Sequence, residues 1–261
     1  MSDGIYSALS GAVAQQRSLD VVANNVANAN TAGFRADRIS FREALAKAGT
    51  QGPAPDGLRF VSVPQIRTTQ LEGSLRETGN PLDMALQGEG WFSVSTPGGE
   101  RYTRAGNFVK DGMGVLRTRD GHALLAWPEG EAGGKAVEIR VPAEVSSIRV
   151  DPDGSLYGRS ENGMNPVLEM PLGRLKIVSF GDGRGLEKQG ANLFKAAANT
   201  PAPAASNAQV SQGYLESGNI NAIEGMNELI TASRSFDAFQ KVIEAFKHID
   251  ERTARDLASR G

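Results

Sequence analysis

The chain has 261 residues, with 28 basic and 30 acidic side chains and a formal net charge of −2. That length allows one large domain or a domain with long extensions, and the balanced charge gives no argument for a nucleic acid or an anionic membrane as partner. The absence of cysteine excludes disulfides, thiolate catalysis and cysteine metal sites.

The N-terminal segment MSDGIYSALSGAVAQQ (residues 1–16) carries Asp3 instead of a basic start and has no continuous apolar core. We therefore do not expect a cleaved secretory signal peptide. The longest apolar runs resemble ALLAW (residues 123–127), far below the roughly 18 residues that a membrane-spanning helix needs. The sequence predicts no membrane insertion, and any passage out of the cytoplasm would use a route without a cleaved signal.

Residues 3 to about 29 are expected to form one amphipathic helix. Its apolar positions alternate in steps of four and three, with Gln16 as one polar member, which is the pattern of a coiled-coil stripe. The apolar members are Ile5, Leu9, Ala12, Leu19, Ala23 and Val26. The only charges here are Asp3, Arg17 and Asp20. Because a solvent-facing helix normally carries charge pairs, we expect this helix to be covered on more than one side.

Asparagines gather where this helix should end, in VVANNVANANTAGF (residues 21–34). They are Asn24, Asn25, Asn28 and Asn30. Asparagine is a weak helix former and a preferred turn residue, so one interpretation is that they end the helix and Gly33 supplies a left-handed cap. The other is an assembly role, because a charge-poor helix rich in Asn, Ala and Ser can approach neighbours closely and exchange side-chain hydrogen bonds.

The middle of the chain predicts an all-β domain of barrel or sandwich type. Short β runs such as WFSVS and RLKIVSF continue to about residue 193, and Asp-Gly pairs such as those at 120–121 and 153–154 mark turns. Stretches rich in Pro, Gly and Ala flank this region. We expect an N-terminal helix and signature at 1–45, a linker at 46–57, the β domain at 58–195, a second linker at 196–212 and a C-terminal helix at 213–261.

The C-terminal part returns to helical periodicity. Its apolar positions are Phe236, Phe239, Ile243, Phe246, Thr253 and Leu257, preceded by Ile223, Met226 and Ile230. Pairs of opposite charge at i,i+4 indicate that the helix face opposite these apolar positions is exposed to solvent. Because the chain offers no third helix, we expect Phe239 and Ile243 to pack against Leu19 or Ala23 of the same or a neighbouring subunit. The predicted fold is α+β, with the terminal helices enclosing the all-β domain in the order of the chain and pairing with each other as a coiled-coil-like layer.

Catalytic motifs are weak. GDGRG (residues 181–185) lacks the third glycine of a dinucleotide loop, and DPDG (residues 151–154) lacks the later ligands of a calcium loop, so both are better interpreted as turns. His122 and His248 have no second ligand at metal-binding spacing.

Three motifs, in order, resemble those of the bacterial flagellar rod and hook proteins. ANNVANANTAGFR (residues 23–35) resembles the N-terminal signature, with Val26 where leucine is usual. GNPLDMALQGEGWFSV (79–94) and RYTRAGNF (101–108) resemble the motifs that open the β domain, with Ala105 where aspartate is common. GYLESGNINAIEGMNELITASRSFDAFQKVI (213–243) resembles the C-terminal helix. Within the family, VLEMPLGRLKIVSF, the C-terminal tail and the short linker after residue 45 are more similar to the proximal rod protein than to the distal one.

The resemblance implies a structural subunit of the flagellar basal-body rod that assembles helically with copies of itself and other rod proteins, transmits torque for motility and is not an enzyme. The terminal helices would line the export channel, with the β domain outside them. The chain would reach the periplasm through the flagellar type III export apparatus, without a cleaved signal, and would need no cofactor, metal, nucleic acid or small-molecule substrate. The expected assembly residues are Ile5, Leu9, Leu19, Asn24, Asn25, Val26, Asn28, Asn30, Thr31, Gly33 and Phe34, with Asn219, Ile223, Met226, Ile230, Phe236, Phe239, Ile243 and Phe246.

Two other classes stay open from the residues alone. One is a secreted carbohydrate-active β enzyme, in which Asp83 and Glu89 beside Trp91 would act as a sugar-cleaving pair. The other is a coiled-coil scaffold or adhesion module unrelated to flagella.

Overall fold

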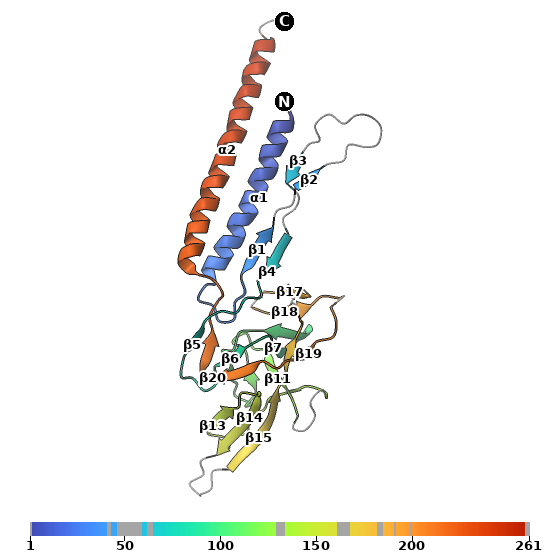
Figure 1. Ribbon diagram of the computed structural model, residues 1–261, viewed down its shortest axis with the longest axis vertical. Helices are drawn as coiled ribbons and strands as arrows, with labels where there is room; N and C mark the ends of the chain where they lie inside the picture. The colour runs from blue at the N-terminus through green and yellow to red at the C-terminus, as the bar shows by residue number, and fades with distance from the viewer. Residues whose placement is uncertain are drawn as a thin grey trace. The chain divides into compact units, whose positions relative to one another are not determined.

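The computed structural model describes residues 2–40, 43–45, 59–61, 65–128, 134–160, 168–181, 185–190, 192–198 and 200–258. The fold is α+β, as the sequence predicted, with a helix near each end of the chain and the β-rich region between them in sequence (Figure 1). The chain divides into two units. We call Met1–Ala29, Ala36–Thr69 and Ile220–Gly261 the helical unit, and Asn30–Arg35 with Gln70–Asn219 the β unit.

In its described residues the helical unit consists of two long helices, α1 (Ser2–Ala27) and α2 (Ala222–Ala258), and four short strands. The helices run antiparallel and side by side (Figure 1). Gln15 Nε2 of α1 donates to the carbonyl oxygen of Ala232 at 3.3 Å, and a Cβ placed at Gly225 would lie 2.7 Å from Val26 Cγ2. Neither helix is long and apolar enough to cross a membrane over its described residues.

Small residues let the two helices come close. Ala8, Gly11, Ala12, Gly225 and Ala232 are all buried. A Cβ at Gly11 would lie 2.6 Å from the Phe239 ring, which therefore rests directly on the backbone of α1.

Two expectations for the helices need correction. Packing of Phe239 on Leu19 or Ala23 of a neighbouring subunit stays a prediction, but within the single chain its ring lies over Gly11, about two turns nearer the N-terminus than Leu19 and about three turns nearer than Ala23. Glycine allows this because a ring can pack onto a helix surface that carries no side chain. The C-terminal helix, expected from residue 213, begins at Ala222, because β21 (Tyr214–Glu216) occupies the residues before it.

A leucine at Gly11 should loosen the helix pair by about 1–3 kcal/mol, since the new side chain would overlap the Phe239 ring. Thermal unfolding followed by far-UV circular dichroism would measure this as a lower midpoint for the helical signal. Gln16→Leu is the matched control, because Gln16 is exposed on the same helix and gains the same side chain. Equal midpoints for the two variants would contradict the close packing at Gly11.

The helical unit also holds short strands. β1 (Asp37–Ser40) pairs antiparallel with β4 (Gln65–Thr68), and β2 (Glu43–Leu45) pairs with β3 (Arg59–Val61). Residues 59–68 were expected in the central β domain, but β3 and β4 belong to the helical unit. The expected linker at 46–57 lies outside the described residues.

The β unit is made of antiparallel strands. They are β5 (Leu75–Glu77), β6 (Met84–Gln87), β7 (Trp91–Thr96), β8 (Gly99–Thr103), β9 (Val109–Lys110), β10 (Leu116–Arg117), β11 (Ala123–Trp127), β12 (Val137–Glu138), β13 (Ser147–Val150), β14 (Ser155–Ser160), β15 (Leu168–Leu175), β16 (Ile177–Ser179), β17 (Leu186–Lys188), β18 (Phe194–Ala196), β19 (Ala204–Ala205), β20 (Gln209–Gln212) and β21. Over the described residues the main sheet follows the open path β13-β14-β15-β11-β7-β8-β18-β17, with five strands off it. The barrel that the sequence allowed is not closed.

Two strand pairs stand apart from the main sheet. β20 pairs with β6, and β21 pairs with β5. The stretch expected as a second linker, 196–212, therefore carries β19 and β20.

The turn at DPDG is confirmed, because the Gly154 amide donates to the carbonyl oxygen of Asp151 at 2.9 Å. Residues 182–184 of GDGRG lie outside the described part.

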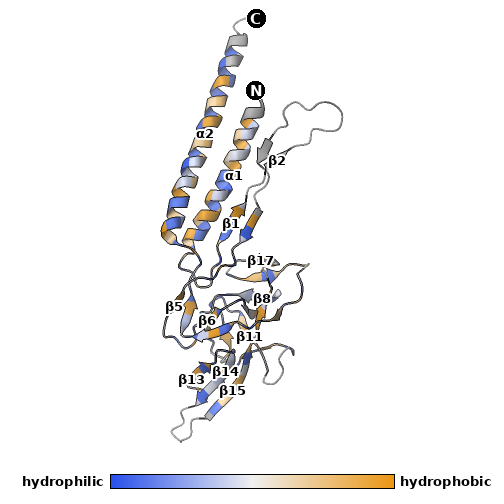
Figure 2. Ribbon diagram, in the orientation of Figure 1, coloured by the Kyte–Doolittle hydropathy of each residue, from blue (hydrophilic) through white to orange (hydrophobic). Residues whose placement is uncertain are grey.

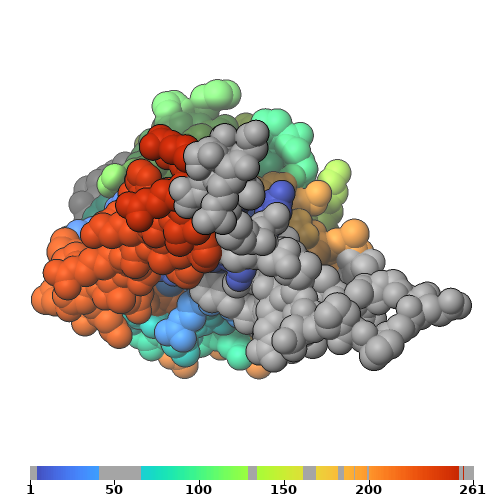
Figure 3. All heavy atoms as spheres, turned by 90° about the horizontal axis from the view of Figure 1, so that it is seen from above, coloured from blue at the N-terminus to red at the C-terminus, as the bar shows by residue number. Residues whose placement is uncertain are grey.

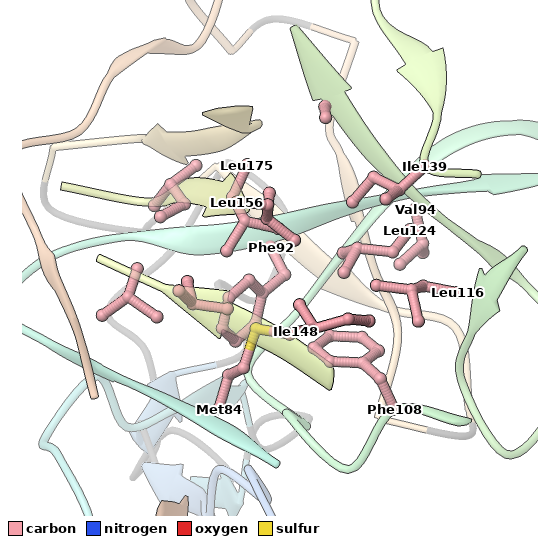
Figure 4. Packing of buried hydrophobic residues seen from close by; sticks show 14 of the residues in the cluster. Met84, Phe92, Val94, Phe108, Leu116, Leu124, Ile139, Ile148, Leu156 and Leu175 are labelled. Carbon is pink, nitrogen blue, oxygen red and sulfur yellow. The ribbon is translucent and has the colours of Figure 1, made fainter. Parts of the chain in front are cut away.

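Strand β7 contributes side chains to two buried clusters of the β unit, one on each face of the strand, because successive residues of a strand point to opposite sides. Phe92 lies in the larger cluster, where its ring meets Phe108 edge to face with centroids 5.2 Å apart (Figure 4). Trp91 lies in the smaller cluster, 4.6 Å from the ring centroid of Phe194. The unit thus has buried apolar groups on both sides of its central strand.

Candidate functional site

The last turn of α1 is closed by one of the signature asparagines. The Asn28 amide donates to the carbonyl oxygens of Asn24 and Asn25, both at 3.2 Å, and Asn28 Nδ2 donates to the Asn24 carbonyl oxygen at 2.9 Å. These bonds satisfy carbonyl groups that a helix end leaves open. Gly33 is left-handed, with φ +66°, but it lies beyond the end of α1 and is not its cap.

Asn25 ties the helix to the first strand. Its Nδ2 donates to the Asp37 carbonyl oxygen at 2.8 Å, and its Oδ1 accepts from the Asp37 amide at 3.0 Å. The side-chain amide of Asn25 thus forms with the Asp37 backbone the same kind of hydrogen bonds, one donated and one accepted, that the backbone of a neighbouring strand would form. Sequence reasoning missed this role, because nothing in the spacing of residues 25 and 37 marks them as partners.

Residues 30–35, which we call the signature loop, belong to the β unit. The Gly33 amide donates to the Glu216 carbonyl oxygen at 2.8 Å. A Cβ at Gly33 would lie 2.2 Å from the backbone nitrogen of Ala105, so only glycine fits there. Phe34 is buried, and Lys188 Nζ lies 4.3 Å from its ring centroid while donating to the Arg35 carbonyl oxygen at 2.6 Å.

A buried ionic group holds the end of this loop. Arg35 Nη1 lies 2.6 Å from Glu216 Oε1, and Arg104 Nη1 lies 3.3 Å from Glu216 Oε2. All three side chains are buried: Arg35 is 1% exposed, Arg104 4% and Glu216 1%. Burial lowers the pKa of Arg104 from its usual value, and the Glu216 carboxylate opposes this shift. We call these three residues the junction cluster.

The junction cluster was not among the predicted sites. Arg104 lies in the RYTRAGNF motif, and Arg35 is the basic residue that follows GF in the signature. Glu216 lies 181 positions beyond Arg35, so no local pattern in the sequence connects them.

The predicted assembly residues fall into three groups by exposure. The exposed ones are Leu9, Asn24, Asn30, Ile223, Met226 and Ile230. The partly buried ones are Ile5, Leu19, Asn25, Val26, Asn28, Thr31, Asn219, Phe236, Phe239, Ile243 and Phe246. Gly33 and Phe34 are buried within the β unit. The assembly role of these residues stays a prediction, and the exposed apolar residues Tyr6, Val13 and Val242 were not in it.

The carboxylates considered for a sugar-cleaving pair have structural surroundings. Asp83 is buried and accepts hydrogen bonds from Thr78 Oγ1 at 2.7 Å and Asn80 Nδ2 at 3.1 Å. Glu89 is exposed, and Trp91 packs in the smaller core cluster. Within the described part of the chain, no group of three or more His, Cys, Asp or Glu residues could hold a metal ion. This arrangement gives the enzyme alternative no support.

Three segments match known protein families. Residues 5–35 match the family described as flagella basal body rod protein, and residues 85–158 match the flagellar hook protein FlgE/F/G D1 domain. Residues 211–256 match the flagellar basal body rod FlgEFG protein C-terminal family. Arg35 lies in the first match, Arg104 in the second and Glu216 in the third, so the junction cluster joins three segments that are recognised separately.

Relatives that match over at least nine tenths of the chain belong to the same family. The chain is 31% identical to the flagellar basal-body rod protein FlgF of Mesorhizobium japonicum over 262 residues, covering 100% of both chains. It is 34% identical to FlgF of Rhizobium meliloti, covering 91% of this chain and 90% of that one. It is 30% identical to FlgG of Bacillus subtilis, covering 93% and 94%. Because the relatives include both FlgF and FlgG, the assignment to the proximal rod protein stays a prediction. The chain belongs to the flagellar basal-body rod protein family.

Proposed function

We propose that this chain is a structural subunit of the rod that joins copies of itself and other rod proteins through the outward faces of α1 and α2. The assembly would be a helical tube in the periplasm that transmits torque. Relatives described as flagellar basal-body rod proteins, matching over the whole chain, support the rod as its location. The observation that carries the proposed interface is a set of apolar side chains that both helices leave exposed.

On α1 these side chains are Tyr6, Leu9 and Val13, which are 58%, 48% and 46% exposed. Their spacing of three and four residues places them on one helix face. Leu9 and Gly11 differ by about 200° around the helix axis at the usual 100° per residue. Since Gly11 contacts Phe239 of α2, the exposed face points away from the second helix.

On α2 the corresponding side chains are Ile223, Met226 and Ile230, which are 74%, 55% and 50% exposed. The buried Ala232, whose carbonyl accepts from Gln15, again lies about 200° from Ile230 around the axis. Figure 2 shows apolar residues along α2, and Figure 3 shows α2, in orange to red, forming part of the surface seen from above. Each helix therefore has one apolar side for its partner helix and another that stays exposed in the single chain.

A second subunit suits these faces better than a small molecule. The 26 residues of α1 and 37 residues of α2 span about 40 and 55 Å at 1.5 Å per residue, which is the scale of a helix-packing interface. α1 carries few charges, so covering its outer face would desolvate little. A head-to-tail contact between identical subunits that does not close produces a helical tube.

We infer that the β unit forms the outer layer of the tube and that the terminal helices pair as a coiled-coil-like inner layer around the export channel. The chain would leave through the flagellar export apparatus without a cleaved signal. A chain without cysteine carries no disulfide that would oppose threading in an unfolded state.

Ile230→Asp should abolish incorporation into the rod, because a carboxylate on the outer face of α2 would be buried unpaired at the subunit contact. Motility assays and immunoblots of isolated basal bodies measure the loss. Gln240→Asp is the matched control, since Gln240 is also exposed on α2 and gains the same carboxylate. Both purified monomers should unfold within about 0.5 kcal/mol of the unchanged chain. Normal incorporation of Ile230→Asp would contradict the proposed interface.

A further inference from the structure

Glu216 bonds residues from three separate parts of the β unit. Its Oε1 accepts from Arg35 Nη1 at 2.6 Å and from the Gly73 amide at 2.9 Å, while its Oε2 faces Arg104 Nη1 at 3.3 Å. Its carbonyl oxygen accepts from the Gly33 amide. One residue near the end of the β unit therefore bonds segments far earlier in the chain.

Neighbouring bonds join the same segments. Arg35 Nη1 and Asn219 Nδ2 both donate to the Leu71 carbonyl oxygen, at 2.6 and 2.8 Å. The Ser217 amide donates to the Ser74 carbonyl oxygen at 2.9 Å. The segments 30–35, 70–74 and 214–219 thus share one hydrogen-bonded network. Each contains a residue at which the chain passes between the β unit and the helical unit, at 35–36, 69–70 and 219–220.

The charges make this network conditional on Glu216. Arg35 and Arg104 are almost fully buried and both contact the Glu216 carboxylate. A buried guanidinium without an opposing charge is strongly unfavourable, and the second guanidinium adds repulsion. Without the Glu216 carboxylate, burial of Arg35 would therefore be unfavourable, and so would docking of the signature loop.

We propose that Glu216 is a closing latch, which lets the signature loop dock only after the C-terminal strand β21 has been placed. Glu216 lies 181 positions from Arg35 and 112 from Arg104, so these contacts close long loops and should form late. β7 and β8 are consecutive strands with local pairing and should form early. The junctions leading into β1, β4 and α2 would then be ordered only in a complete chain. This inference does not depend on the proposed subunit contacts.

The test is hydrogen exchange on the full-length monomer carrying Glu216→Gln, which keeps the side-chain shape and removes its charge. Peptides covering 30–35 and 70–74 should exchange at least about tenfold faster, while those covering β7 and β8 stay unchanged. Glu77→Gln is the matched control, because Glu77 is exposed on β5, the strand that pairs with β21. Uniform acceleration in all peptides, or none at 30–35, would overturn the proposal.

Arg35→Lys provides a second, milder variant in case Glu216→Gln does not fold. It keeps the charge and loses the forked donor geometry, so exchange should also rise at 70–74 and 214–219. A change confined to residues 30–35 would overturn the latch.

Pulse-labelled refolding of the unchanged chain tests the order of docking directly. Residues 30–35 should gain protection together with 211–219 and after β7 and β8, and protection of 30–35 before 211–219 would also overturn it.

Discussion

Replacing Phe92 by alanine should lower the free energy of unfolding of the β unit by about 3–5 kcal/mol. The Phe92 side chain is fully buried, and its ring packs edge to face against Phe108 in the larger core cluster. Both tryptophans of the chain, Trp91 and Trp127, lie in the β unit. Urea unfolding followed by tryptophan fluorescence therefore reports on this unit directly.

Val109→Ala is the control for this substitution. Val109 lies on β9 of the same unit and is 44% exposed, so its truncation should cost about 0.5 kcal/mol or less. A loss below about 1 kcal/mol for Phe92→Ala would mean that the two faces of β7 do not support a packed core as described.

Replacing Gly33 by alanine should undock the signature loop. The left-handed backbone conformation costs a residue with a Cβ about 1–2 kcal/mol, and the added carbon would lie 2.2 Å from backbone atoms of Arg104 and Ala105. Relieving that overlap costs a further 1–3 kcal/mol or so. The expected result is a lower unfolding midpoint and rapid hydrogen exchange at residues 30–35.

Gly79→Ala separates the two causes. Gly79 has nearly the same φ, +69°, but a Cβ there would meet nothing within 4 Å. It should show only the conformational penalty of about 1–2 kcal/mol, and exchange at 30–35 should not change. If the two variants are equally destabilised, the close approach of the signature loop to Arg104 and Ala105 has no energetic consequence.

The sequence by itself determined the two long helices, the turn at 153–154 and the family. Periodicity of three and four predicted α1 and α2, because the hydrophobic pattern of a helix repeats within a few residues and needs no knowledge of its partner. The Asp-Gly pair at 153–154 predicted its turn for the same reason. The signature motifs were recognisable because the residue types and their order are a local property of the chain.

Pairing partners were less accessible to sequence reasoning. Residues 59–68 have the composition of β strands, but composition does not say that β4 pairs with β1 instead of joining the central sheet. The exposed Ile223, Met226 and Ile230 share the apolar pattern of Phe239 and Ile243 farther along α2. The pattern alone could not tell which of these residues face α1, because that depends on the register between two helices distant in the chain.

The clearest difference lies in the signature loop. The sequence identified Gly33 and Phe34 as part of a motif and left open whether the neighbouring asparagines end a helix or serve assembly. Of these, the helix end is local, because Asn28 bonds Asn24 and Asn25. Only the tertiary structure showed that Asn25 bonds β1 and that Gly33 and Arg35 bond Glu216. The physical reason is that caps and turns are set by neighbouring residues, whereas a buried ion pair depends on which distant segments the folded chain brings together.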